Sequence, residues 1–294
     1  MPFEFDWVDA FTARPFGGNG CAVVYGADGL DDDLCKAIVR ETGLVECTFL
    51  SRSDVAEVKV RYFMAHREIP FAGHPTVATV ASMVDRGIVG AGALRLETGA
   101  GVIPIEVTVG TDSVPVVTMT QVRPEFGPEV ETDVVAAVGG LSAADIVGTP
   151  RVVSTGLPFC ITVLKDHNAL RRATLDIAAL ERFRADVGGG LAETMEPFWV
   201  TQEGATEVGQ TFSRLLLAPP MPAEDPFTGS ATGAMAAYLW AGKHLKTRRF
   251  VAEQGHWMGR PGQAQVEVLG EREDISGVRV GGPGYVLMRG YLNI

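Results

Sequence analysis

The chain contains two unusually apolar segments, and alternating apolar and polar residues predict a strand before and a strand after the first of them. Residues 58–62 (VKVRY) and 103–109 (IPIEVTV) place apolar side chains at every second position, which is the period of a half-buried strand. Two other segments, 76–86 and 231–241, are apolar on most sides and carry little charge. A helix without a polar face has to be enclosed by other elements, so we expect two central helices, each with strands curled around it. The pattern predicts the α+β class.

Residues that start and stop helices set the limits of the two central helices. Pro75 suits the first helical position of the first helix, and Gly87 suits the position after its end. Ser230 is predicted as the N-cap of the second helix, which Gly242 ends. The other expected elements are outer helices over 31–42 (Asp31 as N-cap, Gly43 as stop) and 176–187, a linker over 121–128, a turn at 281–284 and a last strand over 285–292.

The chain contains an internal repeat. Residues 68–78 (EIPFAGHPTVA) recur as residues 224–234 (EDPFTGSATGA), an offset of 224 − 68 = 156 residues. Because this offset is a little over half of the 294 residues, it indicates a duplication into two similar domains and not a solenoid of short repeats. We expect domains over 1–120 and 121–294, related by an approximate two-fold axis, with the last strand (285–294) returning to complete the first domain.

The composition is that of a globular chain with an acidic balance. Hydrophobic residues make up 46% and charged residues 21%, so each half can bury a core without disulfides or metals. Lys and Arg number 25 against 36 Asp and Glu, which gives a formal net charge of −11. This charge repels a phosphate backbone, so we expect no nucleic-acid partner.

The acidic first residues, the short apolar runs and the spacing of the cysteines favour a cytoplasmic location. Every apolar run is shorter than the roughly 18 residues of a membrane span, and residues 1–6 (MPFEFD) are acidic where a signal peptide is basic. We therefore expect no membrane partner. The four cysteines lie too far apart for a paired metal site and are too few for a disulfide framework. They are Cys21, Cys35, Cys47 and Cys160.

The starts of the two central helices are candidate binding positions for an anion. A helix N-terminus exposes unpaired N–H groups and about half a positive charge. If the two-fold axis brings Gly73-His74 face to face with Gly229-Ser230, two such ends point at one ligand. We therefore expect a small carboxylic acid as the partner of this protein.

The common cofactor templates are incomplete in this sequence. Residues 18–20 (GNG) lack the third glycine of the dinucleotide motif, and the serine of 229–233 (GSATG) stands one residue too early for a nucleophile elbow. The 5 histidines lack metal-ligand spacing. We expect no cofactor and no metal, which leaves proton transfer by side chains. The candidate acids and bases are Glu46, His74, Asp225 and Ser230.

Several motifs together carry a family resemblance. DAFT at 9–12 leads into FGGN at 16–19, and ECTF (46–49), GHPT (73–76) and EDPFTGSA (224–231) follow. EQG at 253–255 and GRP at 259–261 continue the series. In residue types and spacing the chain resembles the phenazine-biosynthesis PhzF-like family over nearly its whole length. The resemblance implies the diaminopimelate-epimerase-like fold, two pseudo-symmetric domains each with strands curled around a central helix, and a homodimer.

The resemblance also implies an activity and roles for the candidate residues. The type member of the family isomerises trans-2,3-dihydro-3-hydroxyanthranilate without a cofactor, through a glutamate that moves a proton between substrate carbons. Glu46 matches that glutamate. The residues that match substrate-surrounding groups are His74, Asp225 and Ser230, and those that match substrate-binding positions are the amides of Gly73 and Gly229, together with Asn19.

Other readings of these residues remain open at the level of sequence. Glu46 also suits an ordinary strand end, His74 and Ser230 suit helix caps, and Asp225 before a proline suits a turn. An amino-acid epimerase or racemase is the second enzymatic hypothesis, although related epimerases carry a cysteine at each helix start and this chain does not. A protein that binds a small molecule without catalysis is the third. Glu46→Gln distinguishes an isomerase from a binding protein.

Overall fold

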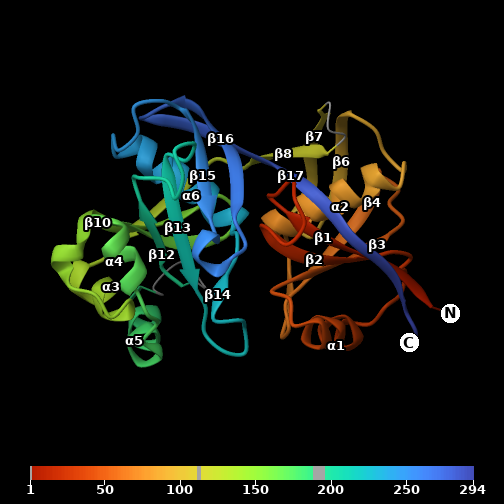
Figure 1. Cartoon of the computed structure of the whole chain (residues 1–294), viewed down its shortest axis with the longest axis horizontal. Helices are drawn as coiled ribbons and strands as arrows, with labels where there is room; N and C mark the ends of the chain where they lie inside the picture. Colours follow the sequence, from red (N-terminus) through yellow and green to blue (C-terminus); the bar gives the residue numbers. More distant parts are fainter. Residues whose placement is uncertain (1, 111–113, 188–195) are drawn as a thin grey trace.

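The protein consists of two lobes that lie side by side, each with a helix at its centre (Figure 1). The computed structural model describes residues 2–110, 114–187 and 196–294, within which the strands join one 17-stranded sheet. The elements of the first lobe are β1 (Phe3–Ala10), β2 (Asn19–Val24), α1 (Asp32–Thr42), β3 (Cys47–Ser51), β4 (Val58–Phe63), β5 (Glu68–Ile69), α2 (Gly73–Asp85), β6 (Gly92–Thr98), β7 (Gly101–Val109) and β8 (Pro115–Gln121).

The second lobe follows without a separate connecting domain, and the last strand is shared by both lobes. Its elements are β9 (Glu125–Glu129), α3 (Thr132–Val138), a 3-10 turn (Ala143–Asp145), β10 (Ile146–Ser154), β11 (Pro158–Leu164), α4 (His167–Arg172), α5 (Ile177–Val187), β12 (Phe198–Thr201), β13 (Thr211–Leu216), β14 (Glu224–Asp225), α6 (Gly229–Ala241), β15 (Arg249–Gln254), a 3-10 turn (His256–Met258), β16 (Gly262–Glu271) and β17 (Asp274–Leu292).

The strands of the first lobe form a closed ring around α2. Neighbouring strands pair in the order β1, β2, β3, β4, β6, β7, β8. Strand β17 pairs with β8 through one part of its length and with β1 through the other, which closes the ring. Helix α2 is buried from Gly73 to Met83, as its lack of a polar face predicts.

The second lobe repeats the topology of the first. In the first lobe β2 pairs in parallel with β3, and β4 with β6 across α2. In the second lobe β11 pairs in parallel with β12, and β13 with β15 across α6. Helices α2 and α6 keep the offset of the sequence repeat, since 229 − 73 = 241 − 85 = 156. The expected α+β fold with two pseudo-symmetric, curled halves is confirmed.

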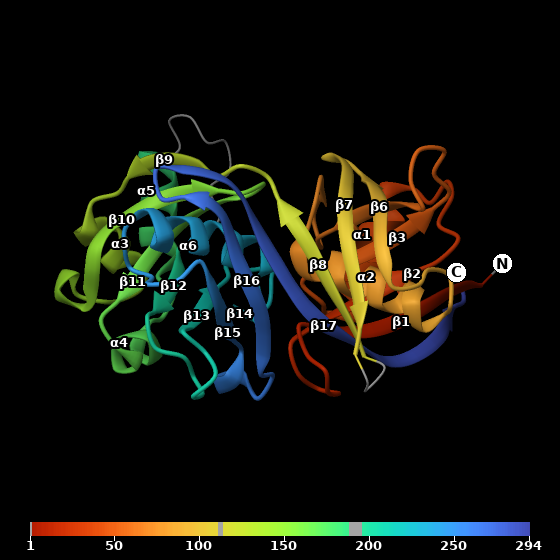
Figure 2. The same ribbon diagram turned by 90° about the horizontal axis from the view of Figure 1, so that it is seen from above.

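Strand β17 crosses from the second lobe to the first and corrects one expectation (Figure 2). Residues 281–284 do not form a turn, because β17 runs without interruption from Asp274 to Leu292. The glycines serve close packing instead. A Cβ on Gly282 would lie 2.4 Å from the ring of Phe11, and one on Gly284 would lie 2.4 Å from Cβ of Ala81 on α2. The last part of β17 pairs with β1, with Phe3 opposite Leu292.

The predicted linker over 121–128 is also shorter than expected. Residues 125–129 form β9, which pairs with β10. The register shifts between Arg151 and Val153 of β10, and Gly127 and Pro128 lie in the stretch of β9 opposite that shift. A proline is tolerated at such an irregularity because no ladder hydrogen bond is required there.

Helix ends agree with the sequence for the outer helices and differ for the central ones. Asp31 caps α1 through its side chain and Gly43 ends it with φ 66°, as predicted, and α5 also matches its predicted range. Helix α2 starts at Gly73, two residues before Pro75. Pro75 still lies in the first turn, where backbone N–H groups have no partner within the helix, so a residue without an N–H is tolerated there. Helix α6 starts at Gly229, so Ser230 lies inside its first turn and Thr228 is the N-cap.

The core is largely continuous between the lobes. One cluster of buried apolar side chains spans both central helices, a second lies beneath α3, α4 and α5, and a third lies beneath α1. None of the helices in the described part of the chain is both long and apolar enough to cross a bilayer.

Candidate active site

The two central helices meet at their N-terminal ends. A Cβ on Gly73 would lie 2.8 Å from the backbone nitrogen of Ser230 and 3.0 Å from Cα of Gly229. A Cβ on Gly229 would in turn lie 3.3 Å from Cα of Gly73. The face-to-face arrangement expected from the repeat is therefore present, and only glycine allows these two helix ends to approach so closely.

Asp225 of β14 lies at the centre of a buried hydrogen-bond network beside these helix ends. Its side chain is 3% exposed. The Asn19 amide donates to Asp225 Oδ1 at 2.6 Å, and the Thr228 hydroxyl donates to Asp225 Oδ2 at 2.5 Å. Gln254 Nε2 donates to the carbonyl of Asp225 at 2.7 Å, and Gln254 Oε1 accepts from the amide of Thr228 at 3.0 Å. Asp225 is therefore held by residues from both lobes.

Glu46 and His74 face Asp225 from the first lobe. Glu46 Oε2 lies 3.7 Å from His74 Nδ1, and the two side chains are 12% and 4% exposed. Asn19 Nδ2 lies 3.1 Å from the same His74 nitrogen, so one amide joins His74 to Asp225. Cys47 packs beneath α1 on the opposite face of β3, as the alternation of a strand predicts.

Burial shifts the protonation of all three titratable groups toward their neutral forms. Desolvation, with a contribution from the charge of Asp225, raises the pKa of Glu46 to about 8. Desolvation also raises the pKa of Asp225 to about 7, although the hydrogen bonds from Thr228 and Asn19 oppose that rise. Burial lowers the pKa of His74 to about 3. Two carboxyls that titrate near neutral pH are suited to proton transfer, because a catalytic acid or base works best when its pKa is close to the working pH.

His74 keeps one ring nitrogen available. The two amide protons of Asn19 go to Asp225 Oδ1 at 2.6 Å and to the carbonyl of Phe227 at 2.9 Å, so the 3.1 Å contact of the same nitrogen with His74 Nδ1 does not fix which ring nitrogen carries the proton. His74 Nε2 is buried and has no hydrogen-bond partner among the residues that the structure describes. A buried polar nitrogen without a partner is costly whether it donates or accepts, which indicates that a ligand atom completes this site.

The site uses the two copies of the repeat differently. At the offset of 156 residues, Asp225 corresponds to Ile69, a buried apolar residue, and Ser230 corresponds to His74. Both members of each pair occupy the same position relative to their helix, since Ile69 pairs with Tyr62 of β4 and Asp225 pairs with Leu215 of β13. The duplicated fold therefore supplies one asymmetric site between the lobes and not two equivalent ones.

Comparison with known proteins agrees with this architecture. The family model described as phenazine biosynthesis-like protein, PhzC-PhzF, matches residues 8–290. The chain belongs to this family. This chain is 32% identical over 289 residues to the uncharacterized isomerase YddE of Escherichia coli (strain K12), and the match covers 93% of this chain and 94% of that protein.

Two solved structures extend the comparison. A phenazine biosynthesis protein of the PhzF family from Bacillus anthracis superimposes with a TM-score of 0.87 at 25% identity and covers 100% of both chains. The predicted epimerase PA4716 from Pseudomonas aeruginosa superimposes with a TM-score of 0.83 at 30% identity and covers 99% of both chains. This PhzC-PhzF chain is accordingly an enzyme of an isomerase family, and the expected family and fold are confirmed.

The candidate site contains three further residues that the sequence did not single out, and they are Thr228, Gln254 and Gln121. Gln121 Nε2 donates to the carbonyl of Gly229 at 2.9 Å, which holds the start of α6. Thr155 donates to Gln121 Oε1 at 2.6 Å. The only sequence signal for Gln254 is its place in the EQG motif, because the contacts of these residues join segments far apart in the chain.

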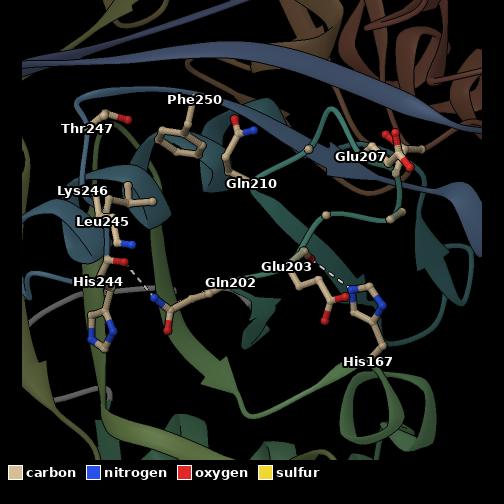
Figure 3. Close-up of a pocket in the computed structure, with 14 residues that line it drawn as sticks. His167, Gln202, Glu203, Glu207, Gln210, His244, Leu245, Lys246, Thr247 and Phe250 are labelled. Atoms are coloured by element: carbon tan, nitrogen blue, oxygen red, sulfur yellow. Dashed lines mark hydrogen bonds between the residues drawn. The ribbon is translucent and has the colours of Figure 1, made fainter.

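An open cavity of about 890 Å³ lies elsewhere on the second lobe (Figure 3). Gln202 Nε2 donates to the carbonyl of His244 across it at 2.8 Å, and His167 contacts the carbonyl of Glu203 at 3.0 Å. None of the candidate acids and bases lines this cavity. Its size alone assigns it no chemistry.

The buried carboxyls predict how stability depends on pH. The folded-state pKa values of Glu46 and Asp225 lie above the unfolded values near 4, so the folded state holds these protons more tightly. The stabilisation of the folded state that these two carboxyls provide is complete below about pH 4 and is lost as pH rises toward about 8. His74 acts in the opposite sense, and its contribution is lost as pH falls from 6.5 toward about 3.

We expect wild type to lose stability relative to Glu46→Gln between about pH 5 and about pH 8, measured by urea denaturation. Parallel stability curves for the two proteins would contradict the raised pKa of Glu46.

Proposed function

We propose that this protein is a cofactor-independent isomerase that moves a proton between carbons of a small carboxylic acid. The substrate class is that of trans-2,3-dihydro-3-hydroxyanthranilate, which the family resemblance implies. In this proposal the Glu46 carboxylate removes a proton from one carbon and the resulting carboxylic acid returns it to another. The reaction takes place in a cleft between the lobes.

The observation that carries the proposal is the buried cluster of Glu46, His74 and Asp225. It brings one carboxyl from each lobe beside a neutral imidazole, Glu46 directly and Asp225 through the Asn19 amide, and His74 Nε2 is left for a ligand. A carboxyl in such a dry site changes between acid and base at neutral pH without a metal. Asp225 and Ser230 are then proposed to hydrogen-bond the polar groups of the substrate while its electrons rearrange.

The facing helix ends are proposed to bind the substrate carboxylate. The amides of Gly73 and Gly229 belong to the first turns of α2 and α6, where N–H groups lack helical partners. Two positive helix ends directed at one position favour an anion there. Asn19 is proposed to act by holding Asp225 next to His74, because its two amide protons are engaged by Asp225 and by the carbonyl of Phe227 at 2.9 Å, and the same nitrogen lies 3.1 Å from His74 Nδ1.

An amino-acid epimerase is the second candidate. The likeness to the predicted epimerase PA4716 favours it. Against it, the helix starts carry His74 and Ser230 where a two-thiol mechanism needs cysteines, and the free thiols of Cys21, Cys35, Cys47 and Cys160 are all buried. Both candidates use proton transfer at carbon, so their products distinguish them.

Deuterium uptake from D₂O tests the proposal. Purified protein is incubated with a panel of cyclic and amino carboxylic acids led by trans-2,3-dihydro-3-hydroxyanthranilate, and products are followed by NMR and mass spectrometry. Movement of a double bond with incorporation of deuterium supports the isomerase, whereas deuterium at an inverted stereocentre supports the epimerase. A rise in melting temperature without any exchange would support a binding protein instead.

Two further parts of the proposal have their own measurements. We propose that the protein works as a homodimer and requires no metal or organic cofactor. Light scattering determines the mass in solution against 31.3 kDa for one chain. Dialysis against a chelator should leave exchange activity within about twofold of the untreated protein, and activity that returns only with added metal would refute this part.

A further inference from the structure

Arg260 crosses from the second lobe to a buried carboxylate of the first. Its Nη2 donates to Asp9 Oδ1 at 2.6 Å and to the carbonyl of Gly17 at 2.8 Å, and its Nε donates to the carbonyl of Gly18 at 2.9 Å. Asp9, at the end of β1, is 0% exposed. Its second oxygen accepts from the amide of Phe16 at 2.8 Å. One guanidinium and one carboxylate thus hold the two ends of the loop over 9–18 together.

This loop ends at the proton-transfer cluster. Gly18 is followed directly by Asn19, whose amide contacts both Asp225 and His74. Only glycine fits at position 18, since its φ is +50° and a Cβ there would lie 1.9 Å from the carbonyl oxygen of Ala10, and Asn19 is bonded directly to it. A displacement of Gly18 therefore moves Asn19.

The loop that carries Arg260 is fixed to the other side of the same cluster. A Cβ on Gly255 would lie 2.4 Å from the carbonyl oxygen of Arg260 and 2.5 Å from that of Pro226, the residue after Asp225. Across the lobes, Gly18 N donates to the carbonyl of Pro261 at 3.0 Å. Arg260 thus connects the loop before Asn19 with the segment after Asp225.

We propose that Arg260 is a positioning residue that sets Asn19 against Asp225 and His74 through the loop over 9–18. The inference rests on the proposed proton-transfer function and adds the element that holds its two lobes in register. Three donor contacts from one planar group, directed at a carboxylate and two carbonyls, require the fork of an arginine. A lysine at this position keeps the charge and loses the simultaneous contacts.

The groups that face Asp225 determine what a displaced Asn19 does. They are Asn19 from β2, Thr228 and Gln254 from the second lobe, and the neighbouring charge of Glu224. Glu46 and His74 face it from the first lobe. The hydrogen bond from Asn19 favours the ionised form of Asp225, so its loss raises the pKa of Asp225.

Arg260→Met and Arg260→Lys test the proposal in the exchange assay. We expect Arg260→Met to lower kcat by about 100-fold with KM within about threefold of wild type, because a misplaced catalytic group affects the reaction step. The limb of the pH profile that follows Asp225 should move to higher pH. Arg260→Lys should recover only part of kcat. The matched control is Arg249→Met, which removes an exposed arginine paired with Glu267 at 2.8 Å on the same lobe and should leave kcat unchanged.

A second measurement does not depend on activity. The carboxyl carbon of Asp225 is titrated by NMR in wild type, Arg260→Met, Asn19→Ala and the double variant. We expect Arg260→Met to raise the pKa of Asp225 in the presence of Asn19 and to have no further effect in its absence. Additive shifts, or no shift in a folded Arg260→Met protein, would overturn the positioning role. If no substrate is found but the coupled shift is observed, the proposed function fails and the positioning role stands.

Discussion

Glu46→Gln should reduce proton exchange by about 10³-fold or more, the upper part of the range for loss of a general acid or base. The amide keeps the size and hydrogen-bonding shape of the carboxylic acid, so the surroundings of His74 remain filled. It cannot take or return a proton at neutral pH. Ligand-induced stabilisation should persist, because the helix ends that are proposed to bind the carboxylate are untouched. NMR measures the rate of proton exchange, and thermal shift measures ligand-induced stabilisation separately.

A matched substitution controls for the loss of one carboxyl. Glu41→Gln removes an exposed carboxylate from the outer helix α1 and should leave exchange unchanged. If Glu46→Gln keeps exchange within about threefold of wild type, Glu46 is not the proton carrier. Asp225 would then be the remaining buried carboxyl of the cluster.

The sequence predicts those parts of the fold that follow from local pattern and from the repeat. The apolar faces of α2 and α6 require enclosure, and the common offset of 156 residues places their N-termini in equivalent positions. The meeting of Gly73 and Gly229 also requires that the two-fold axis pass between these helix ends, and this arrangement is seen only in the structure. The roles proposed for Glu46, His74 and Asp225 depend on the family resemblance, and the structure adds that the three side chains lie together.

The expectations that were wrong concern residues whose surroundings come from distant segments. Glycine and proline at 281–284 predict a turn in isolation, yet each glycine lies against a neighbour that allows no Cβ. Ser230 is a good N-cap by type, but α6 starts at Gly229 with Thr228 as its N-cap, two residues earlier than predicted. Thr228 and Gln254 act on Asp225 through folded geometry, which residue type alone does not specify.

Gly73→Ala should both destabilise the protein and weaken substrate binding. In the first turn of a helix, alanine is ordinarily more stable than glycine by up to about 1 kcal/mol. Here the added Cβ would lie 2.8 Å from Ser230 N and 3.0 Å from Cα of Gly229. These are backbone atoms, which cannot rotate away, so the two helices have to separate. We expect a loss of about 1 to 3 kcal/mol in the free energy of unfolding, measured by urea denaturation.

The same separation has a functional consequence that a stability effect elsewhere would not have. Both helix ends are proposed to bind one carboxylate, so moving them apart should raise KM and abolish ligand-induced stabilisation. Gly229→Ala should have a smaller effect, because its Cβ would lie 3.0 Å from the Phe11 side chain and its nearest backbone atom, Cα of Gly73, would be 3.3 Å away, farther than the backbone atoms that meet a Cβ on Gly73. Gly90→Ala is the control, since a Cβ there meets nothing within 4 Å. If Gly73→Ala is as stable as Gly90→Ala, the helix ends tolerate a methyl group between them, and the close contact does not limit the geometry of the carboxylate site.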